Sequence, residues 1–184
     1  MELVQLDLPA IREAIRIADL CAEAESRTPQ EFCLADIESY RNNPAVLEAE
    51  KLDREFIKSL NSLNYATVLD LEALMQIGRE HTYNFDCEDQ EPVTIEDPET
   101  YFCDCRDYFA DMYPNENGKD LAIEYLVGKG CLAQYWKNAF KVLGLPLKPT
   151  INDLISAASA KVSAQPNTKK SNNNNGQRER ELER

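Results

Sequence analysis

Apolar residues recur along this chain at the spacing of amphipathic helices, and residues that favour helix starts precede most of these segments. A short polar side chain followed within two positions by proline is typical of a helix N-terminus, because the side chain caps free backbone N–H groups. Such pairs are Asp7 with Pro9, Asn43 with Pro44, and Asp97 with Pro98. Thr28-Pro29-Gln30-Glu31 has the form of a capping box and predicts a further start, and Asn64 is a candidate cap for the next helix.

Each expected helix has an apolar face and a polar face. The inward residues that we expect are Ile11, Ala14, Ala18 and Cys21; Phe32, Cys33, Ile37 and Tyr40; Ala49, Leu52, Phe56 and Leu60; Phe102, Cys105, Phe109 and Met112; Leu121, Ala122, Tyr125 and Leu126; and Leu132, Trp136, Phe140 and Leu143. On the outer face of the third segment, Glu50 can pair with Arg54 and Lys51 with Glu55. A weaker last helix is expected over residues 150–161.

The segment Tyr65–Arg79 is apolar around most of its circumference, which is the pattern of a buried helix. No strand alternation of useful length is present, although Pro92–Ile95 could form one short extended piece. The sequence therefore predicts an all-α fold, a single compact bundle of seven or eight helices around Tyr65–Arg79.

Beyond Lys161 the chain is polar, with a run of asparagines and no apolar periodicity. Such a segment has too little apolar surface to offset the entropy of ordering, so we expect a disordered tail over residues 162–184. This tail is mildly basic, whereas the domain expected over residues 1–161 holds nearly all of the acidic residues.

The charge of the whole chain limits the classes of partner. Its 184 residues include 20 Lys and Arg against 33 Asp and Glu, a formal net charge of −13. A surface that binds nucleic acid or anionic lipid directly needs basic residues, so we expect neither partner. No apolar run approaches the roughly 20 residues of a membrane span, and the N-terminal residues lack the basic start of a signal peptide. We expect a cytoplasmic protein whose six cysteines are reduced.

Two blocks of sequence resemble a known family. Phe56–Asn61 leads into Leu71–Arg79 (LEALMQIGR), and Ala122–Gly128 (AIEYLVG) is followed by Leu132–Trp136 (LAQYW) and then Leu143-Gly144. Together they resemble a bacterial family known as a domain of unknown function, over about residues 56–145. The insert from Glu80 to Thr100 and the tryptophan at 136 depart from its pattern. The resemblance implies a helical fold and a bacterial cytosolic origin, and it adds no catalytic residue.

Metal-binding residue types occur at His81, Cys87, Cys103 and Cys105, and all of them suit zinc. Their spacing argues against a site, because residues two apart on a helix point about 200° apart and Cys105 is needed on the apolar face. We expect free thiols and no cofactor, with Cys21, Cys33 and Cys131 in the core. The acidic run Asp86–Glu91 lacks the glycine and the register of a calcium loop and is interpreted as a solvated loop.

An enzymatic hypothesis has little support. His81 is the single histidine, placed just past the expected end of the central helix, and no nucleophile or phosphate-binding motif is present. A pair of Cys87 and His81 needs only spatial proximity. The alternative function is therefore a small metal- or thiol-dependent enzyme centred on His81, Cys87 and Cys103.

Carboxylates are concentrated between Glu80 and Asp111. On the expected helix after Pro98, Asp104, Asp107 and Asp111 follow one another at i, i+3 and i+7, which forms one stripe. A solvated face that keeps the protein soluble explains the stripe most simply. Interleaved tyrosines favour a second interpretation, a non-enzymatic module that docks a basic protein partner, in its most specific form by imitating nucleic-acid phosphates. The residues expected to bind are Asp86, Glu88, Asp89, Glu91, Tyr101, Asp104, Asp107, Tyr108 and Asp111.

Overall fold

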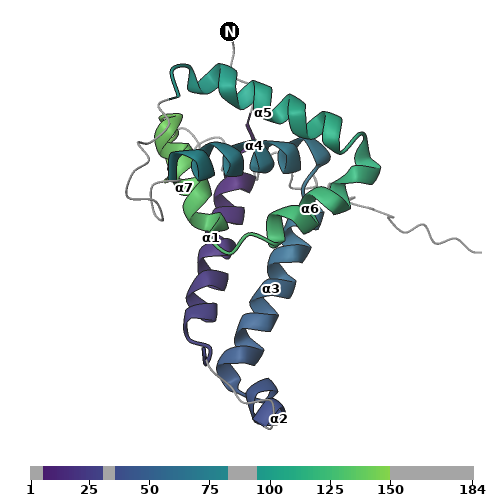
Figure 1. Ribbon diagram of the computed structural model, residues 1–184, viewed down its shortest axis with the longest axis vertical. Helices are drawn as coiled ribbons and strands as arrows, with labels where there is room; N and C mark the ends of the chain where they lie inside the picture. The colour runs from purple at the N-terminus through teal and green to yellow at the C-terminus, as the bar shows by residue number, and fades with distance from the viewer. Residues whose placement is uncertain (1–5, 31–35, 83–94, 150–184) are drawn as a thin grey trace, which may run out of the picture. The chain divides into compact units, whose positions relative to one another are not determined.

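Helices account for all the regular structure in the part of the chain that the computed structural model describes, which is residues 6–30, 36–82 and 95–149. The elements are α1 (Leu8–Ser26), α2 (Ile37–Arg41), α3 (Pro44–Ser62), α4 (Tyr65–Thr82), α5 (Pro98–Met112), the 3-10 turn η3 (Glu116–Gly118), α6 (Lys119–Val127) and α7 (Leu132–Val142) (Figure 1). The predicted all-α fold is confirmed. None of these helices combines the length and apolar character that crossing a bilayer requires.

Some predictions fall outside the described residues. They are the last helix over 150–161, most of the extended piece at 92–95, the tail over 162–184, and Phe32 and Cys33 on the second expected helix. The described residues up to Lys148 form one compact unit.

Side-chain caps fix the starts of α1, α3, α4 and α5, as the sequence predicted. In each case a side-chain oxygen accepts a hydrogen bond from a backbone N–H in the first turn, which would otherwise have no partner inside the helix. The pairs are Asp7 with Ala10 (3.2 Å), Asn43 with Ala45 (2.9 Å), Asn64 with Thr67 (2.8 Å) and Asp97 with Thr100 (3.1 Å).

The predicted helix start at Thr28 is wrong for the described residues. Pro29 and Gln30 are not helical, and the next described helix, α2, begins at Ile37. The Thr28 hydroxyl instead donates to the carbonyl oxygen of Glu25 at 2.7 Å. Thr28 therefore satisfies a free carbonyl at the end of α1, because an i to i−3 bond to the preceding helix competes with capping of a following one.

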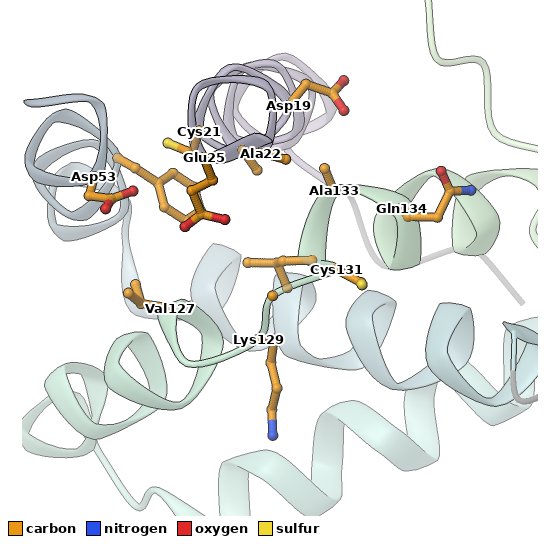
Figure 2. A pocket seen from close by; sticks show the side chains of 14 residues that line it. Asp19, Cys21, Ala22, Glu25, Asp53, Val127, Lys129, Cys131, Ala133 and Gln134 are labelled. Carbon is orange, nitrogen blue, oxygen red and sulfur yellow. The ribbon is translucent and has the colours of Figure 1, made fainter. Parts of the chain in front are cut away.

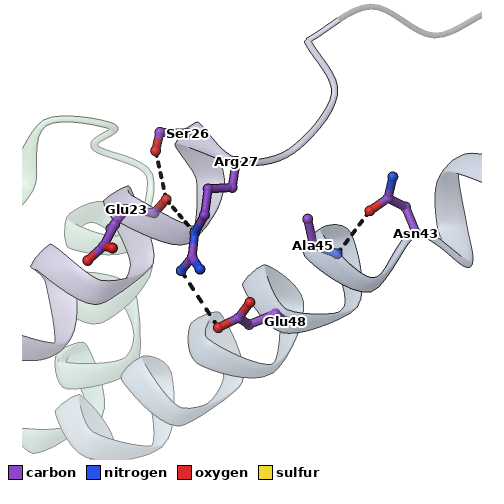
Figure 3. A network of polar contacts seen from close by, with 6 residues as sticks. All are labelled: Glu23, Ser26, Arg27, Asn43, Ala45 and Glu48. Carbon is purple, nitrogen blue, oxygen red and sulfur yellow. Dashed lines mark hydrogen bonds and ion pairs between the residues drawn. The ribbon is translucent and has the colours of Figure 1, made fainter.

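Arg27 connects the end of α1 to the beginning of α3, as Figure 3 shows. Its Nε donates to the carbonyl oxygen of Glu23 at 3.3 Å, and one terminal nitrogen lies 3.6 Å from a carboxylate oxygen of Glu48. The same helices carry surface ion pairs, including the predicted pairs Glu50–Arg54 (3.6 Å) and Lys51–Glu55 (3.9 Å). Exposed pairs such as these add only tenths of a kcal/mol each.

Helix α4 is the buried centre of the fold, as predicted, and it packs against α7, α5, α6 and α1. Seven of its apolar side chains are almost fully buried. The indole Nε1 of Trp136 on α7 donates to the carbonyl oxygen of Leu71 at 2.8 Å, so the largest buried side chain is also anchored to the α4 backbone. The helix continues to Thr82, three residues beyond the predicted end.

Three residues expected in the core are exposed instead. Met112 is 45% exposed and Leu121 is 58% exposed, and the thiol residue Cys131 is also on the surface. Each stands at an element end, in the last turn of α5, the first turn of α6 and the N-cap of α7 respectively. Helical periodicity places them on the apolar face, but it does not show whether another segment covers a side chain at a helix end.

Candidate functional site

The outer surface of α5 carries the acidic stripe that the sequence predicted. Asp104, Asp107 and Asp111 are all exposed, while Phe102 and Phe109 on the opposite side are buried. Tyr108 and Met112 lie on the same helix beside the carboxylates and are 60% and 45% exposed. We call Asp104, Asp107, Tyr108, Asp111 and Met112 the acidic face of α5.

Arg106, the single basic residue of α5, does not neutralise this face. Its Nε donates to Oδ1 of Asp70 on α4 at 2.7 Å, and the Asp70 side chain is almost fully buried. Burial raises the pKa of Asp70, and the guanidinium opposes that rise. Among the described residues, Asp104, Asp107 and Asp111 form no ion pair, so no described cation pairs with a carboxylate of this face.

Arg106→Leu should destabilise the protein by about 2 kcal/mol, because Asp70 would keep a buried carboxyl without its cation. The value is below that of a fully buried pair because a quarter of the Arg106 side chain is exposed. Urea unfolding followed by the fluorescence of Trp136 measures the change. Arg54→Leu removes the same side chain from an exposed pair and should cost less than about 0.5 kcal/mol. Equal losses in the two variants would contradict the structural role of Arg106.

A cleft of about 370 Å³ lies beside the acidic face, between α4, α5 and α6. Its walls include Arg79 from α4, Asp104, Tyr108 and Met112 from α5, and Tyr125 from α6. The rings of Tyr108 and Phe109 meet edge to face with centroids 5.4 Å apart, and those of Phe109 and Tyr125 lie 6.3 Å apart. We call this space the α5 cleft; four of its nine lining residues are aromatic, and one acid and one arginine are among the others.

A chain of hydrogen bonds fixes one end of the cleft. Tyr101 donates its hydroxyl hydrogen to a carboxylate oxygen of Glu80. Gln76 donates to the other oxygen of Glu80 at 2.5 Å and accepts from Nη2 of Arg79 at 2.7 Å. Burial, with Glu80 adding to it, raises the pKa of Tyr101. Tyr101 is thus half-buried and held in place, and of the two tyrosines predicted to pack on a partner only Tyr108 is broadly accessible.

The residues proposed for metal or thiol chemistry do not converge where the structure describes them. His81 is in the last turn of α4, Cys103 is half-buried, and Cys105 is buried with its pKa raised to about 11 by burial. Within the described ranges, no group of three or more His, Cys, Asp or Glu residues could hold a metal ion. Cys87, together with Asp86, Glu88, Asp89 and Glu91, lies outside the described residues.

A second hollow, of about 290 Å³, lies between α1, α3 and the turn that joins α6 to α7 (Figure 2). Cys21 lines it, and burial, with Asp53 beside it, raises the pKa of its thiol to about 11. In Figure 2 the sulfur of Cys131 does not point toward that of Cys21. Asp19, also on the wall, is bound to Lys137 at 2.6 Å. A protonated thiol and an already paired carboxylate make this hollow the weaker candidate.

The burial of Glu72 was not predicted from the sequence. It is 0% exposed, and neither carboxylate oxygen has a hydrogen-bond partner among the described residues. Burial raises its pKa to about 8, and the charge of Lys129 opposes this only in part. The spacing of two acids in the sequence could have predicted a buried carboxyl. Asp70 and Glu72 are two residues apart on one helix and point about 200° apart, so both cannot lie on one narrow exposed strip.

Comparison with family models, with curated proteins and with solved structures gave no match for this chain. The resemblance of residues 56–145 to a bacterial family therefore stays a prediction.

Proposed function

We propose that this protein is a non-enzymatic binding module that docks a basic segment of a partner protein on the acidic face of α5. The observation that carries the proposal is the inward turn of Arg106 onto Asp70, at 2.7 Å. It pairs the one cation of α5 with a buried carboxylate and leaves three exposed carboxylates on α5 without an ion pair among the described residues.

Charge and contact area occur together on this face. Asp104, Asp107 and Asp111 can steer a basic segment toward α5, because complementary charges raise the rate of encounter. Tyr108 and Met112 are exposed beside them and offer apolar area for the alkyl stems of lysine and arginine. A face that served solubility alone would need the carboxylates but not the exposed tyrosine and methionine.

The sequence also predicts partner binding by an acidic segment that precedes α5. Asp86, Glu88, Asp89 and Glu91 precede α5 in the sequence and add four carboxylates to the chain. They lie outside the described residues, so the proposal depends on the acidic face of α5 alone.

A triple variant tests the proposal with a defined probe. The probe is a fluorescent peptide rich in lysine and arginine with glycine and serine spacers. It should bind the full chain, weaken steeply from low to moderate salt, and bind about tenfold more weakly to the variant Asp104→Asn, Asp107→Asn, Asp111→Asn. The melting temperature of the variant should stay close to that of the unchanged protein, because exposed substitutions cost little.

A control variant of equal charge change separates this surface from the overall charge. The control variant carries exposed substitutions on α2 and α3, namely Glu38→Gln, Glu50→Gln and Glu55→Gln. It also removes three negative charges. Peptide affinity should change much less than in the α5 variant. Equal weakening by both triple variants, or binding that does not respond to salt, would overturn the proposed site.

A further inference from the structure

We infer that the α5 cleft receives an aromatic side chain of the same partner, so that the recognised segment is an aromatic residue flanked by lysine or arginine. This inference rests on the proposed function. It adds a specificity-determining contact to what would otherwise be attraction between opposite charges.

The size and lining of the α5 cleft suit one large side chain. Its volume of about 370 Å³ is near the lower end of the range for small-ligand sites, about 300–1,000 Å³. Tyr125 and Phe109 form an aromatic wall, and Tyr108 and Met112 stand exposed at its edge. An aromatic ring can meet such walls edge to face or offset, and aromatic anchors in pockets provide much of the affinity of typical interfaces.

The positive charge of Arg79 determines which class of side chain the α5 cleft can bind. Arg79 lines the cleft, and its guanidinium donates to the neutral amide oxygen of Gln76 at 2.7 Å. Its Nε is buried and has no hydrogen-bond partner among the described residues. A lysine or arginine entering the cleft would meet this positive charge, whereas an aromatic ring can stack on the guanidinium plane.

Asp104 belongs to both parts of the surface. It lines the α5 cleft and begins the stripe that continues through Asp107 and Asp111. A basic residue next to the aromatic anchor in the partner sequence can therefore reach Asp104 while the ring occupies the cleft. The geometry assigns the aromatic residue to the cleft and the basic residues to the outer face.

Three peptides of equal length test the inference with the full chain. The first has a tryptophan flanked by lysines and arginines, the second has alanine in place of the tryptophan, and the third keeps the tryptophan but replaces the basic residues by serine. We expect the first to bind about tenfold more tightly than the second, which is the loss typical of removing an aromatic anchor. The third should bind more weakly than the first.

The results distinguish the two proposals. Equal affinity for the first and second peptides would overturn the aromatic anchor and leave the acidic docking face intact. Equal affinity for the first and third would overturn the proposed function, because charge would then contribute nothing.

The variant Arg79→Met tests whether the preference for the tryptophan peptide arises in the α5 cleft. It keeps the stem of the side chain and removes the guanidinium, so the preference for tryptophan over alanine should fall while the alanine peptide binds no more weakly than before. Arg54→Met makes the same chemical change on the exposed surface of α3 and should leave the preference unaltered. A preference that Arg79→Met leaves unchanged would overturn the role of the guanidinium.

Discussion

Gly78→Ala is expected to destabilise the protein by about 4 kcal/mol or to prevent folding, since steric overlap in a core is among the few causes of losses this large. A Cβ atom at position 78 would lie 1.7 Å from the carbonyl oxygen of Tyr135 and 2.4 Å from its carbonyl carbon. These are backbone atoms of α7, so no side chain can rotate to make room. The two helices would have to separate along their contact, which includes the buried Trp136.

Gly130→Ala is the matched control for this prediction. Nothing lies within 4 Å of a Cβ atom built at Gly130, so the same substitution should change stability by no more than about 1 kcal/mol. Urea unfolding measures both variants, and helix content by circular dichroism identifies a Gly78→Ala protein that does not fold. A Gly78→Ala protein as stable as the control would contradict the close approach of α4 and α7.

Local sequence patterns were sufficient to predict most of the helices. Asp7, Asn43 and Asp97 predicted helix starts because a cap depends only on residues within one turn. The apolar circumference of Tyr65–Arg79 predicted the central helix, because such a helix has no face suited to water. These features depend on near neighbours in the chain, and the structure confirms them.

The features that the sequence did not predict depend on contacts between segments that are distant in the chain. Cys131 and Met112 are exposed at helix ends, and periodicity cannot show whether another segment covers a side chain there. The α5 cleft needs side chains from three helices, so spacing along one helix could identify Asp104 and Tyr108 but not Arg79 or Tyr125. The exposed stripe was predictable since Asp104, Asp107 and Asp111 belong to one helix.

Glu72 gives the stability of the protein a specific dependence on pH. In the folded state its pKa is about 8, whereas an ordinary glutamate has 4.5. As pH rises above 4.5 the unfolded chain releases this proton while the folded chain retains it, so unfolding becomes progressively more favourable. The contribution levels off above pH 8, where both states have lost the proton.

Glu72→Gln should therefore be more stable than the unchanged protein by a margin that grows between pH 5 and pH 8 and is constant above it. The full change in the margin is on the order of 4 kcal/mol, because one pKa unit corresponds to about 1.4 kcal/mol. Glutamine keeps the shape and polarity of the side chain, so the growth of the margin with pH reports the proton alone. Urea unfolding at a series of pH values, followed by Trp136 fluorescence, measures it.

Two further variants separate the charge of Glu72 from its unmet hydrogen bonds. Glu72→Met removes both, and it should exceed Glu72→Gln in stability by a similar amount at every pH, because a buried amide without partners costs about 1–3 kcal/mol. Glu124→Gln, an exposed substitution on α6, is the control for exchanging a glutamate for a glutamine outside the core. If Glu72→Gln behaves like Glu124→Gln, the carboxyl of Glu72 is not buried without a partner, and the packing of α4 against α5 and α6 differs from that described.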